Sequence, residues 1–169
     1  VEKQSLLPKD IEWHFIGSLQ TNKLKQVVPL ATLIHSVDSI KLLEAINRYA
    51  ESQHIISHLL LEVHVAKENT KHGFSIEEIK TFFSHKSWEA YPAVHICGFM
   101  TMGTYGVTEE SNRTEFELVA NLFKEIQHTF HAPYFKTLSM GMSNDYTIAV
   151  AAGSNMVRIG SSIFGERAY

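Results

Sequence analysis

The stretch His58-Leu59-Leu60-Leu61-Glu62-Val63-His64-Val65 decides the fold class of this chain. It is an almost continuous apolar run, which is typical of a β-strand whose two faces are both buried. Such strands occur mainly in parallel sheets that helices cover. We therefore expect helical segments before and after this run.

Short β-rich runs alternate with longer amphipathic runs along the chain. Strict alternation of strands and helices implies parallel strands joined by right-handed crossovers. Two architectures fit, an open doubly wound sheet and a closed (β/α)₈ TIM barrel, and about 30 residues per unit favour a barrel with six of its eight strands. The predicted strands are 12–16, 33–36, 58–65, 93–99, 137–140 and 156–160, and the predicted helices are 19–28, 39–46, 75–83, 109–129 and 143–152.

Capping residues indicate where three of the helices begin. Asp38 or Ser39 can cap the second helix, and Ser75 with Glu78 makes a capping box for the third. Ser143 with Asp145 opens the short fifth helix. For Asp38, a role as helix cap is a simpler interpretation than a role as catalytic acid.

Composition excludes several classes of protein. The 169 residues are 44% hydrophobic and 20% charged, with a formal net charge of -3, which gives no reason to expect a nucleic acid or an anionic membrane as partner. The single cysteine, Cys97, excludes an internal disulfide and suits a reducing compartment. With no signal peptide and no apolar run long enough to cross a bilayer, a cytoplasmic protein is expected.

The start of the sequence is unusual, because Val1-Glu2-Lys3-Gln4 reads like the middle of a helix and no initiator Met precedes it. We expect a single domain over residues 1–169 that lacks its N-terminal part. Nucleotide-binding glycine motifs, a nucleophile elbow and zinc-binding histidine pairs are not found in the sequence.

Two candidate anion-binding loops follow the last two predicted strands. Ser139, Met140 and Ser143 lie where a strand gives way to a helix, and Gly160 and Ser161 lie just beyond the final strand. In (β/α) barrels, these loops commonly bind phosphate through backbone N–H groups and small hydroxyls. Ordinary turn and cap chemistry is the alternative interpretation.

Two polar residues interrupt apolar strands. Arg158 lies within Met156-Val157-Arg158-Ile159, where a guanidinium needs partners or a ligand; a structural ion pair is the alternative. His14 lies between Trp13 and Phe15, and a core histidine bonded to a backbone carbonyl is the commoner outcome. Packing is the simpler role for Cys97, Met100 and Met102.

These segments, in order, resemble the YggS/PROSC family of pyridoxal-phosphate homeostasis proteins. The resemblance runs nearly end to end, and six pieces in register make it specific. The pieces are 13–17 with 19–20 and 22–23, then 35–39, then Glu68 with Lys71 and Gly73, then 98–102, then 138–143 with Asp145, and finally 157–160 with 163–165 and Arg167.

The resemblance implies a single barrel like the N-terminal domain of alanine racemases, with pyridoxal 5'-phosphate (PLP) as cofactor. It places the phosphate on the loops with Ser139-Met140 and Gly160-Ser161, and His14 and Phe15 in the pocket wall. It places Arg158 against the pyridine nitrogen, where an arginine keeps that nitrogen unprotonated and weakens the ring as an electron sink. This implies a non-catalytic carrier in vitamin B6 homeostasis, with PLP-dependent apo-enzymes as possible partners.

The sequence departs from the family at the cofactor lysine, in an asparagine-bearing pocket strand expected after it, and in the loop 103–106. Family members hold PLP as a Schiff base on a lysine upstream of the Trp13-His14 motif, and no lysine of this sequence matches it. No catalytic residue is therefore predicted. Two alternatives stay open: a PLP-dependent amino-acid racemase or decarboxylase, and a fragment unable to hold the cofactor covalently.

Overall fold

The computed structural model of the chain describes residues 6–65 and 72–165. Glu68, Lys71 and Arg167, which contribute to the family resemblance, lie outside these ranges. The strands are β1 (His14–Phe15), β2 (Leu33–Val37), β3 (Ser57–Glu62), β4 (Val94–Met100), β5 (Thr137–Met142) and β6 (Met156–Arg158). The helices are α2 (Leu24–Val27), α3 (Ile40–Ser52), α4 (Ile76–Ser84), α5 (Glu109–Thr129), α6 (Tyr146–Ala151) and α7 (Ser161–Phe164), with short 3-10 turns η1 (Thr21–Lys23) and η2 (Ser87–Ala90).

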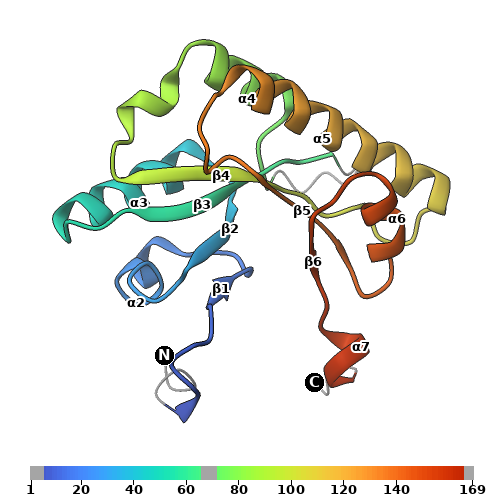
Figure 1. The fold of residues 1–169 in the computed structure, drawn as a ribbon, viewed down its shortest axis with the longest axis horizontal. Helices are drawn as coiled ribbons and strands as arrows, with labels where there is room; N and C mark the ends of the chain where they lie inside the picture. The colour runs from blue at the N-terminus through green and yellow to red at the C-terminus, as the bar shows by residue number, and fades with distance from the viewer. Residues whose placement is uncertain (1–5, 66–71, 166–169) are drawn as a thin grey trace.

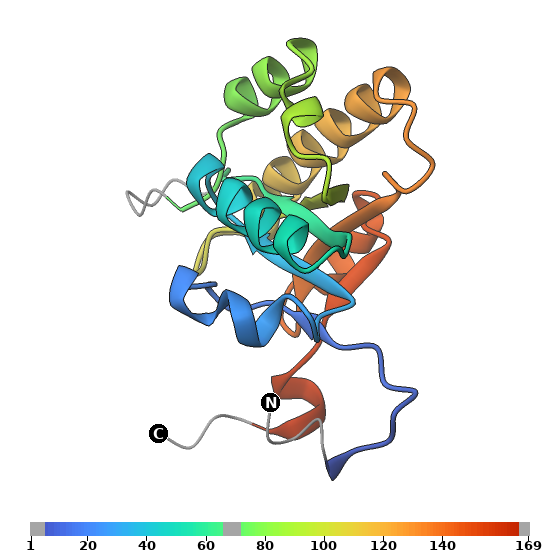
Figure 2. The same ribbon diagram turned by 90° about the vertical axis from the view of Figure 1, so that its left-hand side faces the viewer.

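The strand order decides between the two predicted architectures. All six strands are parallel and pair in the order β1-β2-β3-β4-β5-β6. A doubly wound sheet reverses its order at a switch point, whereas a barrel adds each new strand on the same side. The sheet curves, and the longer helices α3, α4 and α5 lie around its outer side (Figures 1 and 2). The fold is therefore of the (β/α) barrel type.

Side chains on the two faces of the sheet form two different layers. On the outer face, residues such as Ile34, Phe99 and Leu138 pack with the helices into the main core. On the inner face, a smaller apolar cluster comprises Leu33, Leu60, Cys97 and Met100. Because strand side chains alternate between faces, the residues two positions beyond Leu33 and Leu60, namely His35 and Glu62, share the inner face. The inner layer therefore becomes polar toward the carboxyl ends of the strands.

Helix α5 is the element that sequence periodicity predicts best. Its bounds, 109–129, are those predicted, and Phe116, Val119, Ala120 and Phe123 are all buried. The cap of α3 is Ser39, whose hydroxyl accepts from Leu42 N, and Ser75 with Glu78 forms the capping box of α4. Cap chemistry therefore located these helix starts correctly.

The N-terminal elements are shorter than predicted. Strand β1 covers 14–15 where 12–16 was predicted, and the helix predicted over 19–28 is a 3-10 turn followed by the four-residue α2. Strand β3 ends at Glu62, before the predicted end at residue 65, and Val63 beyond it forms an isolated bridge to Phe74. Helix α7 was not predicted.

Two glycines allow close packing near the carboxyl ends of the strands. A Cβ on Gly98 (φ +145°) would lie 1.8 Å from the carbonyl oxygen of Thr137, its partner on β5, so only glycine lets β4 and β5 approach here. A Cβ on Gly141 (φ +94°) would lie 2.7 Å from Cβ of Ala149. Gly141 therefore lets α6 pack directly on β5, which fixes the loop 143–145 between them.

Within the described residues, the structure contains no helix of the length and apolar character that a bilayer crossing requires.

Candidate functional site

A groove of about 990 Å³ lies at the carboxyl ends of the strands. Its walls come from β1 and β6, from the loop 102–107 after β4, and from the loops after β5 and β6. This is the end at which parallel (β/α) barrels carry their functional sites. The residues that line it include His14, His35, Ser143, Arg158, Gly160 and Ser161.

Arg158 is held by neutral acceptors on β5 and just after the end of β4. Its Nη1 donates to both the carbonyl oxygen and the hydroxyl of Ser139, each at 2.9 Å, and its Nη2 donates to the carbonyl oxygen of Thr101 at 3.0 Å. The predicted alternative was a structural ion pair, but none of the carboxylates in the described ranges pairs with Arg158. The guanidinium is therefore a fixed cation at the groove.

Burial lowers the pKa of Arg158, and the negative charges of Asp145 and Glu62 oppose that shift. Asp145 lines the groove, and its carboxylate accepts from the backbone N–H of Met142 at 2.6 Å. Glu62 is only 8% exposed; burial first, and then the charge of Asp38, raise the pKa of its carboxyl. Charged side chains of both signs therefore lie close together where burial limits their access to water.

A chain of hydrogen bonds crosses the inner face from β1 to β6. His14 Nδ1 lies 3.1 Å from His35 Nε2, and His35 Nδ1 lies 3.1 Å from the Ser139 hydroxyl. His35 is 1% exposed, and burial, followed by the charges of His14 and Arg158, lowers its pKa from 6.5 to about 4. His35 is therefore neutral near pH 7, and His14 is not the carbonyl-bonded core histidine of the alternative interpretation.

Ser143 joins the two predicted anion loops. Its hydroxyl oxygen accepts from the backbone N–H of Gly160 and from that of Ser162, each at 3.3 Å. Two amide groups of the loop after β6 therefore converge on one point beside the loop after β5. Ser143, Gly160 and Ser161 all line the groove, as Arg158 and His14 do.

Three predicted site residues lie elsewhere. Ser139 is fully buried below the groove, where it binds Arg158 and His35. Met140 is fully buried in the main core, and its N–H donates to the Ser154 hydroxyl at 3.2 Å. Phe15 packs against the same core. Met140 and Phe15 lie on the outer face because each follows an inward-pointing neighbour, Ser139 and His14.

Several groove residues were not predicted as site residues. His35 is the important one, since it bonds to Ser139. Thr101, which bonds to Arg158 but does not line the groove, was not predicted as a site residue either. The sequence does distinguish His35, because it is a polar residue in the largely apolar strand 33–37. His14 and Arg158 interrupt apolar strands in the same way. The loop 102–107 also contributes, and Glu115 holds it by accepting from the Thr104 N–H (2.9 Å) and hydroxyl (2.8 Å).

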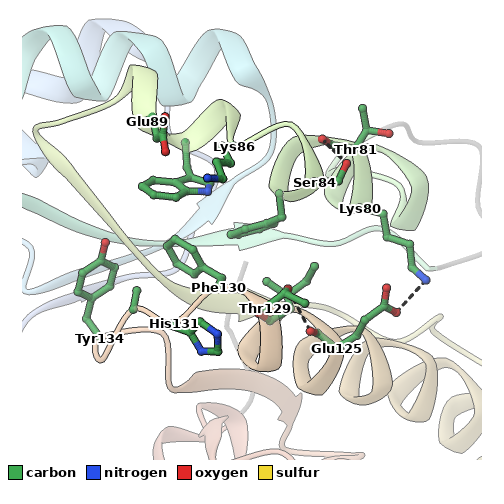
Figure 3. Close-up of a pocket in the computed structure, with 14 residues that line it drawn as sticks. Lys80, Thr81, Ser84, Lys86, Glu89, Glu125, Thr129, Phe130, His131 and Tyr134 are labelled. Atoms are coloured by element: carbon green, nitrogen blue, oxygen red, sulfur yellow. Dashed lines mark hydrogen bonds and ion pairs between the residues drawn. The ribbon is translucent and has the colours of Figure 1, made fainter.

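A second cavity, of about 780 Å³, lies between the C-terminal ends of α4 and α5 (Figure 3). Aromatic rings form its base, including Trp88 and Phe130, whose centroids are 5.0 Å apart. On its rim Lys80 and Glu125 form an ion pair at 2.8 Å, so their charges offset each other. The first groove, with its fixed cation and converging amides, is the better candidate site.

The comparisons with known proteins agree with this fold. Residues 7–168 match the family model "Alanine racemase, N-terminal domain", which defines the class as a (β/α) barrel of that type. The structure of PipY from Synechococcus elongatus without PLP has a TM-score of 0.88 at 31% identity, covering 97% of this chain and 76% of PipY. The PipY structure with PLP bound has a TM-score of 0.85 at 30% identity, covering 97% and 74%.

A relative from Aquifex aeolicus, named pyridoxal phosphate homeostasis protein, is 39% identical over 166 residues, covering 98% of this chain and 72% of the relative. A relative of the same name from Synechocystis is 36% identical, covering 97% and 78%. The chain belongs to the family of pyridoxal phosphate homeostasis proteins. The family resemblance predicted from the sequence is thereby confirmed.

The groove fits part of a PLP molecule. The amides of Gly160 and Ser162 converge on the Ser143 hydroxyl, a donor set that suits a phosphate, and Arg158 adds a fixed cation to the same groove. A covalent attachment point is not matched, since no lysine is among the described residues that line the groove.

Proposed function

We propose that this chain binds PLP in the groove and acts as a non-catalytic carrier in vitamin B6 homeostasis. The observation that carries the proposal is the convergence of the Gly160 and Ser162 amides on the Ser143 hydroxyl, with Arg158 fixed in the same groove. The names of the curated relatives and the PLP-bound PipY structure support this choice of ligand.

The hydrogen-bond donors of the groove indicate which residues would contact each part of PLP. Ser143, Gly160 and Ser161 would hold the phosphate through hydroxyl and amide groups, which suit an anion better than a neutral ligand. Arg158 would donate one of its two remaining N–H groups to the ring nitrogen. His14 would form the wall beside the ring. Because arginine does not give up its proton, it leaves the ring nitrogen unprotonated and the ring a poor electron sink, which suits a carrier.

Equilibrium dialysis of the chain against PLP tests this assignment. Ser143→Ala removes a hydrogen bond to a charged group, worth roughly 1.5–3 kcal/mol, and should weaken PLP affinity about tenfold or more. Ser52→Ala is the matched control, since Ser52 on α3 donates only to the nearby Tyr49 carbonyl and is exposed. Equal affinities of the two variants would refute the phosphate assignment.

Two further measurements test the carrier role. Steady racemisation or decarboxylation of amino acids in the presence of PLP would refute a non-catalytic role. Delivery to apo-enzymes should appear as faster reactivation of a PLP-dependent apo-enzyme by the loaded chain than by the same amount of free PLP.

A further inference from the structure

We propose that His14 presents a fixed N–H donor to the groove and thereby selects a ligand whose ring carries an oxygen acceptor. A one-way series of hydrogen bonds from Arg158 through Ser139 and His35 sets which ring nitrogen of His14 holds the proton. The inference deepens the proposed function and rests on it for the identity of the ligand. Ser139 and His35 become positioning residues, because they act on the ligand only through His14.

The series begins at Arg158, whose guanidinium can donate but cannot accept. Its Nη1 lies 2.9 Å from the Ser139 hydroxyl oxygen, so that oxygen accepts. Ser139 is 0% exposed, and a buried hydroxyl proton without an acceptor is costly. Among the described residues, the remaining hydrogen-bond contact of this hydroxyl is His35 Nδ1, at 3.1 Å. Ser139 therefore donates to His35.

The direction of this bond fixes the tautomer of His35. A neutral imidazole has one N–H and one bare nitrogen, and burial keeps His35 neutral near pH 7 by lowering its pKa to about 4. Because Nδ1 accepts from Ser139, the ring proton lies on Nε2. The opposite tautomer would point the Nδ1–H of His35 at Ser139 and leave the hydroxyl proton without an acceptor.

The proton of His35 in turn fixes the tautomer of His14. His35 Nε2 lies 3.1 Å from His14 Nδ1 and donates to it, so the proton of the neutral His14 ring is on its Nε2. His14 Nε2 has no hydrogen-bond partner among the described residues, and the exposed ring lines the groove. The outer end of the series is therefore an N–H donor that is open to the groove.

Polarisation strengthens the donor at His14. Arg158 carries a full positive charge, and each hydrogen bond in a continuous series polarises the next one. All the bonds of this series point away from the guanidinium, so the His14 N–H is more positive than that of an isolated imidazole. Such a donor suits an oxygen acceptor. The ring of PLP carries two of them besides the phosphate, the oxygen at ring position 3 and the aldehyde oxygen.

Nitrogen NMR of the histidine rings in the unaltered chain without ligand tests the direction of the series. We expect the ring proton of His35 on Nε2, with a scalar coupling through this proton to His14 Nδ1. A ring proton on His35 Nδ1, or the absence of the coupling, overturns the proposal. A histidine that only fills space would show neither a single tautomer nor the coupling.

The chain contains a control pair for this measurement. His58 and His95 have ring centroids 5.2 Å apart, as His14 and His35 do, yet no hydrogen bond joins their side chains within the part of the chain that the structure describes. We expect no coupling between these two rings. The coupling between His14 and His35 therefore reports the hydrogen bond and not mere proximity.

Equilibrium dialysis against PLP tests the contact of His14 with the ligand. His14→Phe keeps a flat ring and removes the donor, so it should weaken PLP affinity about tenfold. His14→Gln keeps an N–H at a similar distance from the backbone and should restore most of the affinity. His58→Phe is the control and should change nothing, because His58 lies near the amino end of β3, away from the groove.

Two analogues of PLP identify the oxygen that His14 binds. Pyridoxamine 5'-phosphate lacks the aldehyde oxygen, and 3-deoxypyridoxal 5'-phosphate lacks the oxygen at ring position 3. His14→Phe should weaken the binding of PLP but not that of the analogue without the acceptor. An equal loss for all three ligands, or no loss for PLP, overturns the contact.

The outcomes are separable from those of the proposed function. If the unaltered chain binds no PLP, the proposed function is contradicted, and the NMR measurement still decides the direction of the series. If PLP binding depends on Ser143 but not on His14, the proposed function stands and the donor role of His14 is wrong.

Discussion

Arg158 on β6 donates through one nitrogen, Nη1, to both the carbonyl oxygen and the hydroxyl of Ser139 on β5. The two residues are 19 positions apart, and only parallel pairing of β5 with β6 brings them together. A further bond to Thr101 links the same guanidinium to the end of β4. The cation of the groove is therefore also a structural tie across three consecutive strands of the barrel.

Replacing Arg158 should destabilise the fold as well as weaken ligand binding. Arg158→Met leaves the carbonyl oxygens of Ser139 and Thr101 without this donor, and an unsatisfied buried acceptor costs about 1–3 kcal/mol. Relief from burying a charge offsets part of this loss, so we expect a net loss of about 1–3 kcal/mol in urea unfolding. Arg113→Met, at an exposed position on α5, is the control and should change stability little. Equal unfolding midpoints would contradict the prediction.

Acidification should unfold the protein partly through His35. Its pKa is lowered from 6.5 to about 4 by burial, so the unfolded chain binds a proton before the folded one does. The stabilisation from neutral His35 is complete above pH 6.5 and is lost as the pH falls toward 4, by on the order of 3 kcal/mol.

His35→Gln should flatten this part of the stability profile, and His128→Gln, at an exposed histidine of α5, should not. Unfolding free energies across this pH range provide the measurement. A slope in the His35 variant as steep as in the parent chain would show that another group causes the acid sensitivity.

Glu62 should have the opposite linkage. Burial and the charge of Asp38 raise its pKa above the ordinary 4.5, so its contribution is complete below pH 4.5 and is lost as the pH rises through the folded value. Glu62→Gln removes the charge that must otherwise form in the interior. We expect the variant to gain stability relative to the parent as the pH increases from 4.5 to neutral, measured by thermal unfolding. A constant difference at all pH values would refute this linkage.

The barrel could be predicted from sequence because local patterns dominate it. Helix α5 repeats its apolar residues at helical spacing, and the run around Leu60 shows a strand buried on both faces. The short β1 was overestimated because the residues around His14 have strand character while the pairing with β2 extends over only two residues. The length over which two strands pair depends on both strands, and the local propensity of one strand carries no information about the other.

The site was only partly predictable. Arg158 could be found because a charge in an apolar strand is costly anywhere. The contact of His35 with Ser139 joins positions 104 apart, and depends on the register of β2, β3, β4 and β5 together, which no local pattern reveals. Strand alternation, however, does separate Ser139 from Met140 and His14 from Phe15 onto opposite faces. Applied to these strand residues, it would have assigned Met140 and Phe15 to the core.

Cys97 should be inert in the folded chain and reactive once it unfolds. The thiol is 7% exposed, packs in the inner apolar cluster with Leu60, and donates weakly to the His95 carbonyl at 3.5 Å. Burial raises its pKa, which lowers the fraction of thiolate, the nucleophilic form. Since it is the only cysteine, a thiol-reactive disulfide reagent should release one equivalent of chromophore, slowly in buffer and rapidly in denaturing urea. Comparable rates in the two conditions would mean that the inner layer of the barrel opens to solvent much more often than its packing implies.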